Sequence, residues 1–229
     1  MNHRFDATRE FEASLDTIGL VANSLMSPEA LRPANLSVTN SMCCACVVLL
    51  SGYFESYLKS LIKEYIESIN SLGLEISNIP FAMQLLHYSG GADALQFVAR
   101  QDKGLNSTLF SQDLSARLGS LRIPVGYTLA WESFANTKSN PGAKTVSDLL
   151  AGIDVKGGWT ALNELCKTYG RLDTFLDAFI KVRNICAHTG RHSTPPSGLD
   201  LKDYSDRFLA ISECMDTLVA IRLDDFGSS

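Results

Sequence analysis

The sequence lacks several features that would assign the chain to a class at once. Its 229 residues carry 20 Lys and Arg against 25 Asp and Glu, so the net charge is −5. A protein that coats nucleic acid regardless of sequence is basic, so any contact of this chain with nucleic acid should be local. Only four residues are histidine, which restricts where histidine chemistry can occur.

Long hydrophobic runs are also missing. No run of about 18 uncharged apolar residues is present, so no transmembrane helix is expected. The longest candidate, residues 42–50, is soon followed by Glu55, Lys59 and Lys63. Residues 1–16 are charged throughout and contain no apolar core of a signal peptide. We therefore expect a cytoplasmic protein that makes no contact with a membrane.

The six cysteines show neither the spacing of a metal site nor that of a disulfide framework. The cluster CCAC at residues 43–46 lacks the paired CxxC spacing of a zinc site. Most of the cysteines lie in apolar segments with helical spacing, so we expect reduced thiols in the core. The six residues are Cys43, Cys44, Cys46, Cys166, Cys186 and Cys214.

Apolar residues recur at spacings of three and four along most of the chain, which is typical of amphipathic helices. Gly90 and Gly91, after Ser89, mark a candidate break in the third of these helices. The predicted helices cover residues 5–26, about 37–70, 80–100, 159–169, 172–188 and 204–223.

Residues 101–160 are the least regular part, because glycine and proline interrupt short helical patches there. The chain shows no internal repeat, no low-complexity tract and no linker long enough to separate two domains. The sequence therefore predicts an all-α fold, a single helical-bundle domain over residues 1–229 with an irregular central insertion at about 101–160. Its core helices are expected at about 40–70 and 171–190.

The end of the predicted helix 172–188 holds two of the four histidines, in the stretch RNICAHTGRH at residues 183–192. Asn184 and His188 are four residues apart and therefore share a helix face. Arg183 lies about 140° from His188 around the axis, but its long side chain can still bring a guanidinium alongside the imidazole. Gly190 is expected to end the helix.

A local excess of positive charge surrounds this stretch. Residues 166–192 contain five basic and two acidic side chains, a balance of +3 in a chain of −5. A positive face on an acidic protein suits a phosphodiester ligand. The basic residues are Lys167, Arg171, Lys181, Arg183 and Arg191.

Two plainer interpretations of the same residues remain open. Basic residues near a helix C-terminus complement the helix dipole, and a histidine before a terminal glycine can cap the last carbonyls. A zinc site of Cys186, His188 and His192 fits the spacing less well, because Gly190 interrupts the helical geometry and no second ligand cluster is evident.

Arg183, the polar residue Asn184, three spacers and His188 resemble the Rx4–6H signature of the HEPN superfamily. The earlier segment CVVLLSGYFESYLKSLIKEYI looks like the first core helix of longer HEPN proteins, such as RiboL-PSP-HEPN-like or related defence-type proteins. The resemblance covers about residues 42–69 and 171–190 well, and the remainder only through helical composition.

This resemblance implies an all-α bundle that dimerises through the motif helix. Many members are endoribonucleases that need no metal or other cofactor and act in toxin–antitoxin, phage-defence or RNA-processing systems. It implies single-stranded RNA or tRNA loops as substrate, and a cognate antitoxin as a further candidate partner. Other members are non-catalytic modules that bind RNA, nucleotide or protein, and a helical scaffold with no activity is the third hypothesis.

The resemblance also implies a role for each residue of the candidate site. Arg183 and His188 would be the catalytic pair, with Asn184 as support. Four further residues are expected to contact or organise the substrate, and Glu55 is expected to pair with Arg183 or Lys181 unless it is a surface carboxylate. These four are Glu55, Lys181, Arg191 and His192.

Overall fold

The structure, a computed structural model, describes residues 5–101, 105–121, 126–137, 141–189 and 194–228. Within these ranges the chain forms eight α-helices, three 3₁₀ helices and no strand, which confirms the predicted all-α class.

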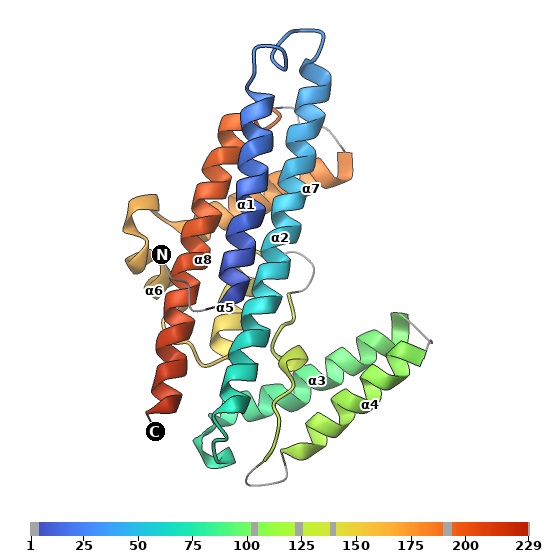
Figure 1. The fold of residues 1–229 in the computed structure, drawn as a ribbon, viewed down its shortest axis with the longest axis vertical. Coiled ribbons are helices and arrows are strands. Elements are labelled where there is room, and N and C mark those ends of the chain that lie inside the picture. Colours follow the sequence, from blue (N-terminus) through green and yellow to red (C-terminus); the bar gives the residue numbers. More distant parts are fainter. Residues whose placement is uncertain (1–4, 102–104, 122–125, 138–140, 190–193, 229) are drawn as a thin grey trace.

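Three long helices lie side by side and form the main bundle: α1 (Asp6–Leu25), α2 (Leu36–Ser71) and α8 (Gly198–Gly227) (Figure 1). Their apolar faces meet in an aromatic cluster. The Phe11 ring stacks on Tyr57 at a centroid distance of 4.9 Å, and Phe54 lies 4.8 Å from Phe208. Burial of such rings is the main stabilising contribution to a helical core.

The length and composition of α2 do not match the expectation that no helix of the chain could span a membrane. By length and composition alone it could cross a bilayer, because the stretch from Leu36 to Phe54 contains polar residues but no charged ones. The central helix of a soluble bundle passes the same test. In this fold α2 packs against α1, α8 and the motif helix.

The helices α3 (Phe81–Gln101) and α4 (Leu105–Ser120) form a hairpin beside the bundle (Figure 1); the short 3₁₀ helix η1 (Ile76–Asn78) precedes them. The break expected at Gly90-Gly91 is wrong, because α3 runs through both glycines. A Cβ on Gly90 would overlap the Ser133 carbonyl oxygen, and one on Gly91 would overlap the Leu118 side chain. These glycines therefore serve close packing rather than a turn.

The central region is also more regular than predicted, since α4 and α5 (Ala143–Gly152) lie within residues 101–160. Irregular backbone is concentrated in residues 126–137, here called the strap, which contains the 3₁₀ helix η2 (Trp131–Ser133). Arg117 fastens the hairpin to the strap by two 2.8 Å hydrogen bonds to the Glu132 carboxylate, the strong bidentate arrangement.

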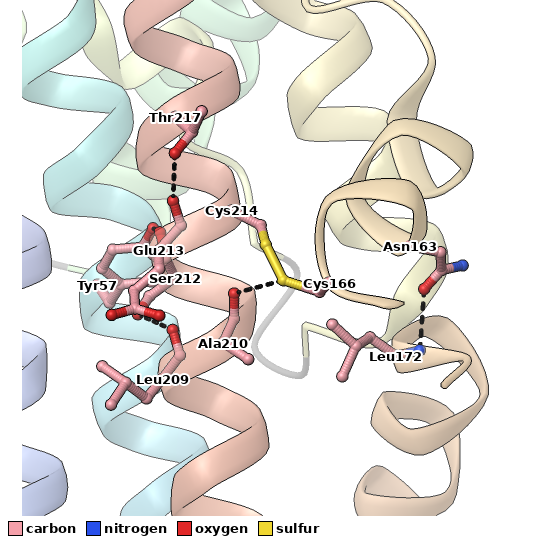
Figure 2. The surroundings of a disulfide bond; sticks show 10 residues. All are labelled: Tyr57, Asn163, Cys166, Leu172, Leu209, Ala210, Ser212, Glu213, Cys214 and Thr217. Atoms are coloured by element: carbon pink, nitrogen blue, oxygen red, sulfur yellow. Dashed lines mark hydrogen bonds between the residues drawn. A yellow bond between two sulfur atoms is a disulfide. The ribbon is translucent and has the colours of Figure 1, made fainter. Parts of the chain in front are cut away.

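After α5, the short helices α6 (Gly158–Leu165) and η3 (Lys167–Tyr169) lead into α7 (Leu172–Thr189). The expectation of reduced core cysteines is wrong for two of the six. Cys166, at the end of α6, forms a disulfide with Cys214 of α8 across a Cα separation of 6.8 Å (Figure 2), within disulfide range. The other four are free and buried: Cys43, Cys44, Cys46 and Cys186.

The last helix begins earlier than the predicted residue 204. Ser197 and Asp200 form a capping box, in which the Ser197 hydroxyl accepts from the Asp200 backbone N–H at 3.2 Å and the Asp200 carboxylate accepts from the Ser197 N–H at 2.7 Å. This reciprocal pair satisfies the backbone N–H groups of Ser197 and Asp200, and α8 starts at Gly198.

Candidate functional site

The motif helix α7 is fixed at its start by a side chain from α6. The Asn163 Oδ1 accepts a hydrogen bond from the Leu172 backbone N–H at 2.9 Å (Figure 2), and Asn163 Nδ2 donates to Asp173 at 3.2 Å. One turn further along α7, the Asp177 carboxylate accepts from the Ala143 N–H at 2.9 Å, at the start of α5. These bonds set the position of the helix relative to α5 and α6.

The buried face of α7 agrees with the sequence pattern except at one position. Leu172, Leu176 and Phe179 are fully buried, whereas Ile185, which continues the apolar spacing of the helix, is 43% exposed. Cys186 takes that place at 3% exposure. It lies seven residues after Phe179, and seven residues bring a helix to within about 20° of the same direction.

The Cys186 side chain packs between α7 and α2. Burial raises the pKa of the Cys186 thiol to about 12, and a hydrogen bond with Cys44 of α2 contributes to this shift. A thiol with such a raised pKa is a poor nucleophile at neutral pH. We therefore assign Cys186 a packing role at the α2–α7 contact.

The three motif residues differ in their exposure to solvent. His188 is exposed, and Arg183 and Asn184 are half-buried. The Arg183 Nη1 donates to the Asn184 Oδ1 at 3.2 Å, and the buried Arg183 Nε has no hydrogen-bond partner. A guanidinium is a group that can bind an oxyanion bidentately, and the imidazole of His188, five residues further along α7, is exposed to solvent.

The other residues expected at the site are only partly tested. Lys181 is exposed on α7, one turn before Ile185. Gly190, Arg191 and His192 lie outside the described residues, so the predicted helix end and substrate contacts stay predictions.

Glu55 of α2 does not form the direct ion pair with Arg183 or Lys181 that the sequence suggested. Its Oε1 accepts hydrogen bonds from Lys59 Nζ at 2.7 Å and from Thr137 Oγ1 at 2.8 Å. Partial burial raises the pKa of Glu55, but these two hydrogen bonds and the charges of Lys59 and Arg183 outweigh burial and hold it below its ordinary value. The Arg183 charge thus acts on Glu55 without a direct bond.

Sequence reasoning missed two residues of this arrangement. Lys59 follows Glu55 by four residues, the spacing of a helical ion pair, and could have been found from the sequence. Thr137 reaches Glu55 across 82 residues of chain, and no local pattern indicates such a contact.

The zinc interpretation can be judged only for its described ligands. Cys186 is buried and His188 is exposed, because residues two apart point to opposite sides of a helix. In the described part of the chain, no group of three or more His, Cys, Asp or Glu side chains is placed to hold a metal ion.

This fold and this helix define an all-α protein of the HEPN type. The model of the RiboL-PSP-HEPN family matches residues 8–220, so the chain belongs to that family. Domains of the HEPN type are generally ribonucleases or nucleotide-binding modules. A search of curated proteins and a search of solved structures found no match.

Proposed function

We propose that the chain is an endoribonuclease that cleaves RNA by attack of the ribose 2′-OH, without a metal ion. The observation that supports this most directly is on α7, which carries an exposed His188 and, five residues earlier, a half-buried Arg183. Histidine near neutral pH can take or give a proton, and a fixed guanidinium can stabilise the charge of a phosphorane.

The reaction needs a base, an acid and a cation. One imidazole removes the proton of the 2′-OH, and the 2′-oxygen then forms a bond to phosphorus while the bond to the 5′-oxygen breaks. An imidazolium protonates the leaving 5′-oxygen, and Arg183 binds the non-bridging oxygens. The products are a 2′,3′-cyclic phosphate and a 5′-hydroxyl end. Asn184, bonded to Arg183, supports the guanidinium.

A single chain offers one motif histidine, so we propose a two-fold dimer that brings two His188–Arg183 pairs to one cleft. Exposed apolar residues support this arrangement. Ile185 lies beside the motif, and Val38, Met42 and Leu49 form an exposed stripe on α2 at helical spacing. Exposed apolar patches of this kind are typical of interfaces.

Purified protein should degrade single-stranded RNA or tRNA in EDTA and leave 2′,3′-cyclic phosphate ends. His188→Ala and Arg183→Ala should each abolish cleavage while the fold and dimer persist, and exposed Lys202→Ala on α8 serves as a charge control. Wild-type-like cleavage by His188→Ala would falsify the assignment. A stable dimer that cleaves no RNA across a broad panel would instead identify a non-catalytic binding module.

We further propose that the protein acts in the cytoplasm in a toxin–antitoxin or phage-defence system, with a cognate antitoxin as partner. Expression of the wild type beside His188→Ala in a host cell tests this role through growth and RNA integrity. Growth arrest by the wild type alone is expected. Equal growth of both strains with intact RNA would contradict a toxic role.

A further inference from the structure

The Cys166–Cys214 disulfide joins the end of the short helix α6 to the long helix α8 (Figure 2). Cys166 is partly exposed and the residues on both sides of it are exposed, whereas Cys214 is only 7% exposed. A reductant can therefore reach the Cys166 sulfur, with Cys214 as the leaving thiol. Exposed disulfides are typically the ones that are broken and re-formed during function.

The surroundings of this bond suit the reduced state as well as the oxidised one. The Cys166 Sγ lies 3.3 Å from the backbone carbonyl oxygen of Ala210 on α8 (Figure 2). A reduced Cys166 thiol can therefore donate a hydrogen bond to that oxygen while α8 keeps its shape. The four free cysteines are buried, so the Cys166–Cys214 pair is the one that a reagent in solution reaches first.

Apart from the disulfide, α6 is held to the core by few contacts. Leu162 is the only buried residue among the eight of α6, and the following helix η3 has none. The half-buried Trp159 adds a 2.7 Å hydrogen bond from its Nε1 to the Ala143 carbonyl at the start of α5. A helix this short is not stable by itself. Loss of the disulfide should therefore loosen α6.

Asn163 links the position of α6 to the motif helix. It lies one turn before Cys166 and accepts from the Leu172 backbone N–H at 2.9 Å (Figure 2), and it donates to the Asp173 carboxylate at 3.2 Å. Its bond to Leu172 supplies a partner in the first turn of α7, where N–H groups have none within the helix. The contacts thus form a continuous path from the disulfide to the start of the helix that carries the motif.

We propose that the Cys166–Cys214 disulfide is a reversible redox switch, which fixes the start of α7 when oxidised and releases it when reduced. This inference rests on the proposed ribonuclease function, because its consequence is faster cleavage of RNA by the oxidised protein. A motif helix held in one position keeps its catalytic groups aligned. The proposed cytoplasmic location is consistent with a reversible bond, since disulfides of cytoplasmic proteins are usually transient and serve catalysis or redox sensing.

Both directions of the switch balance with a dithiol and a peroxide as the reagents. In reduction, a thiolate of dithiothreitol attacks the Cys166 sulfur, and Cys214 leaves and takes up a proton. The second thiol of the reagent then releases Cys166 as a thiol, and the reagent becomes a cyclic disulfide. In oxidation, hydrogen peroxide converts one cysteine to a sulfenic acid, and the other thiol displaces water from it. Two thiols and one peroxide thus give one disulfide and two waters.

The first test compares oxidised protein with protein reduced by dithiothreitol. Hydrogen exchange of the amides in α6 and in residues 172–176 should be faster after reduction, while the amides of α4, in the hairpin beside the bundle, serve as the reference and should not change. The cleavage rate should fall roughly tenfold, less than the hundredfold that a fixed misplacement of about 1 Å can cost. Hydrogen peroxide should restore both values as each chain loses two hydrogen atoms in mass spectra.

Two variants show whether the effect follows this path. Cys166→Ser cannot form the disulfide and keeps a hydroxyl that can donate to Ala210, so it should behave like the reduced protein in both reagents. Asn163→Ala keeps the disulfide and removes the bonds to α7, so its cleavage rate should be low in both redox states. Cys43→Ser, at a free and buried cysteine, is the matched control and should respond to both reagents as the wild type does.

The outcomes separate this inference from the proposed function. Equal exchange at the start of α7 in the oxidised and reduced proteins would overturn the inference and leave the ribonuclease assignment intact. Equal cleavage rates in the two states of an active enzyme would do the same, as would a redox response that persists in Cys166→Ser or Asn163→Ala. Redox-dependent exchange in a protein that cleaves no RNA in either state would support the action of the disulfide on α7 and overturn the ribonuclease.

Discussion

Asn70 of α2 holds the backbone of Leu129 with both of its polar groups: Nδ2 donates to the Leu129 carbonyl at 3.0 Å, and Oδ1 accepts from the Leu129 N–H at 2.8 Å. Leu129 is buried, so water cannot replace both bonds. Asn70→Ala should lower the free energy of unfolding by about 1–3 kcal/mol, the cost of leaving buried polar groups unsatisfied. Denaturant unfolding measures this, with the exposed Asn23→Ala as control. Equal stability of the two variants would contradict the role of Asn70.

Two helical glycines should respond to alanine in opposite directions. Alanine at Gly52 meets open space on α2, so Gly52→Ala should stabilise by up to about 1 kcal/mol through helix propensity. Alanine at Gly90 would overlap the Ser133 carbonyl oxygen, so Gly90→Ala should destabilise despite the same propensity gain. Thermal unfolding of both variants gives the comparison. A rise in Tm for Gly90→Ala would show that α3 does not pack closely on the strap.

These glycines illustrate how far the sequence determines the fold. The boundaries of α7 follow from the spacing of Leu172, Leu176 and Phe179, because burial of one stripe is a local pattern. At Gly90 the same local reasoning failed, since the residue is small to admit a neighbour 43 residues further along the chain.

The candidate site likewise has one part that the sequence predicts and one part that it does not. The spacing of Arg183 and His188 could be read from ten residues and from a family resemblance. The arrangement around Glu55 could not, because Thr137 arrives from a segment with no periodicity and the distance between α2 and α7 is set by packing. The Cys166–Cys214 disulfide was missed for a similar reason, since composition gives no Cα separation between two cysteines that are distant in sequence.

His87 should make the stability of the protein depend on pH. Burial lowers the pKa of His87 to about 4, and its Nδ1 accepts from the Ala130 N–H at 3.1 Å. The unfolded chain takes up a proton below about pH 6.5, whereas the folded chain stays neutral at this residue until about pH 4. Stability is therefore complete above pH 6.5 and falls between pH 6.5 and 4, by up to about 3 kcal/mol.

His87→Asn keeps an acceptor near the Ala130 N–H and removes the titrating ring. Subtracting the pH dependence of this variant from that of the wild type isolates the contribution of His87, because the carboxylates are common to both. Urea unfolding at pH 7 and at pH 4.5 provides the two points. Parallel curves for the wild type and His87→Asn would show that His87 is not buried in its neutral form.

The Cys166–Cys214 disulfide closes a loop with a sequence separation of 48. Restriction of the unfolded chain by a loop of this length contributes up to about 4 kcal/mol in the chain-entropy treatment. The oxidised protein should therefore lose stability in a thiol reductant, and the Cys166→Ser, Cys214→Ser double variant should match the reduced wild type. Cys43→Ser at a free cysteine should leave the effect of the reductant unchanged. A reductant without effect on Tm would exclude this disulfide in the purified protein.

A charge introduced at the exposed apolar residue beside the motif should disrupt the proposed dimer. Ile185 is 43% exposed on α7, in a helix whose opposite side is held by the core. Ile185→Asp should leave the monomer folded but separate the subunits, because two carboxylates related by a two-fold axis would be buried close together without partners. Cleavage should fall with the dimer, since each subunit would retain a single His188.

Sedimentation velocity and RNA cleavage at the same protein concentrations check this prediction together. Leu20→Asp on α1 is the matched control, because Leu20 is 72% exposed and lies on a helix outside the proposed interface, so it should alter neither measurement. An Ile185→Asp protein that is monomeric yet cleaves at the wild-type rate would contradict the dimeric active site. It would show that the Arg183 and His188 of one subunit are sufficient for the reaction. A dimer that survives the substitution would place the interface on another face.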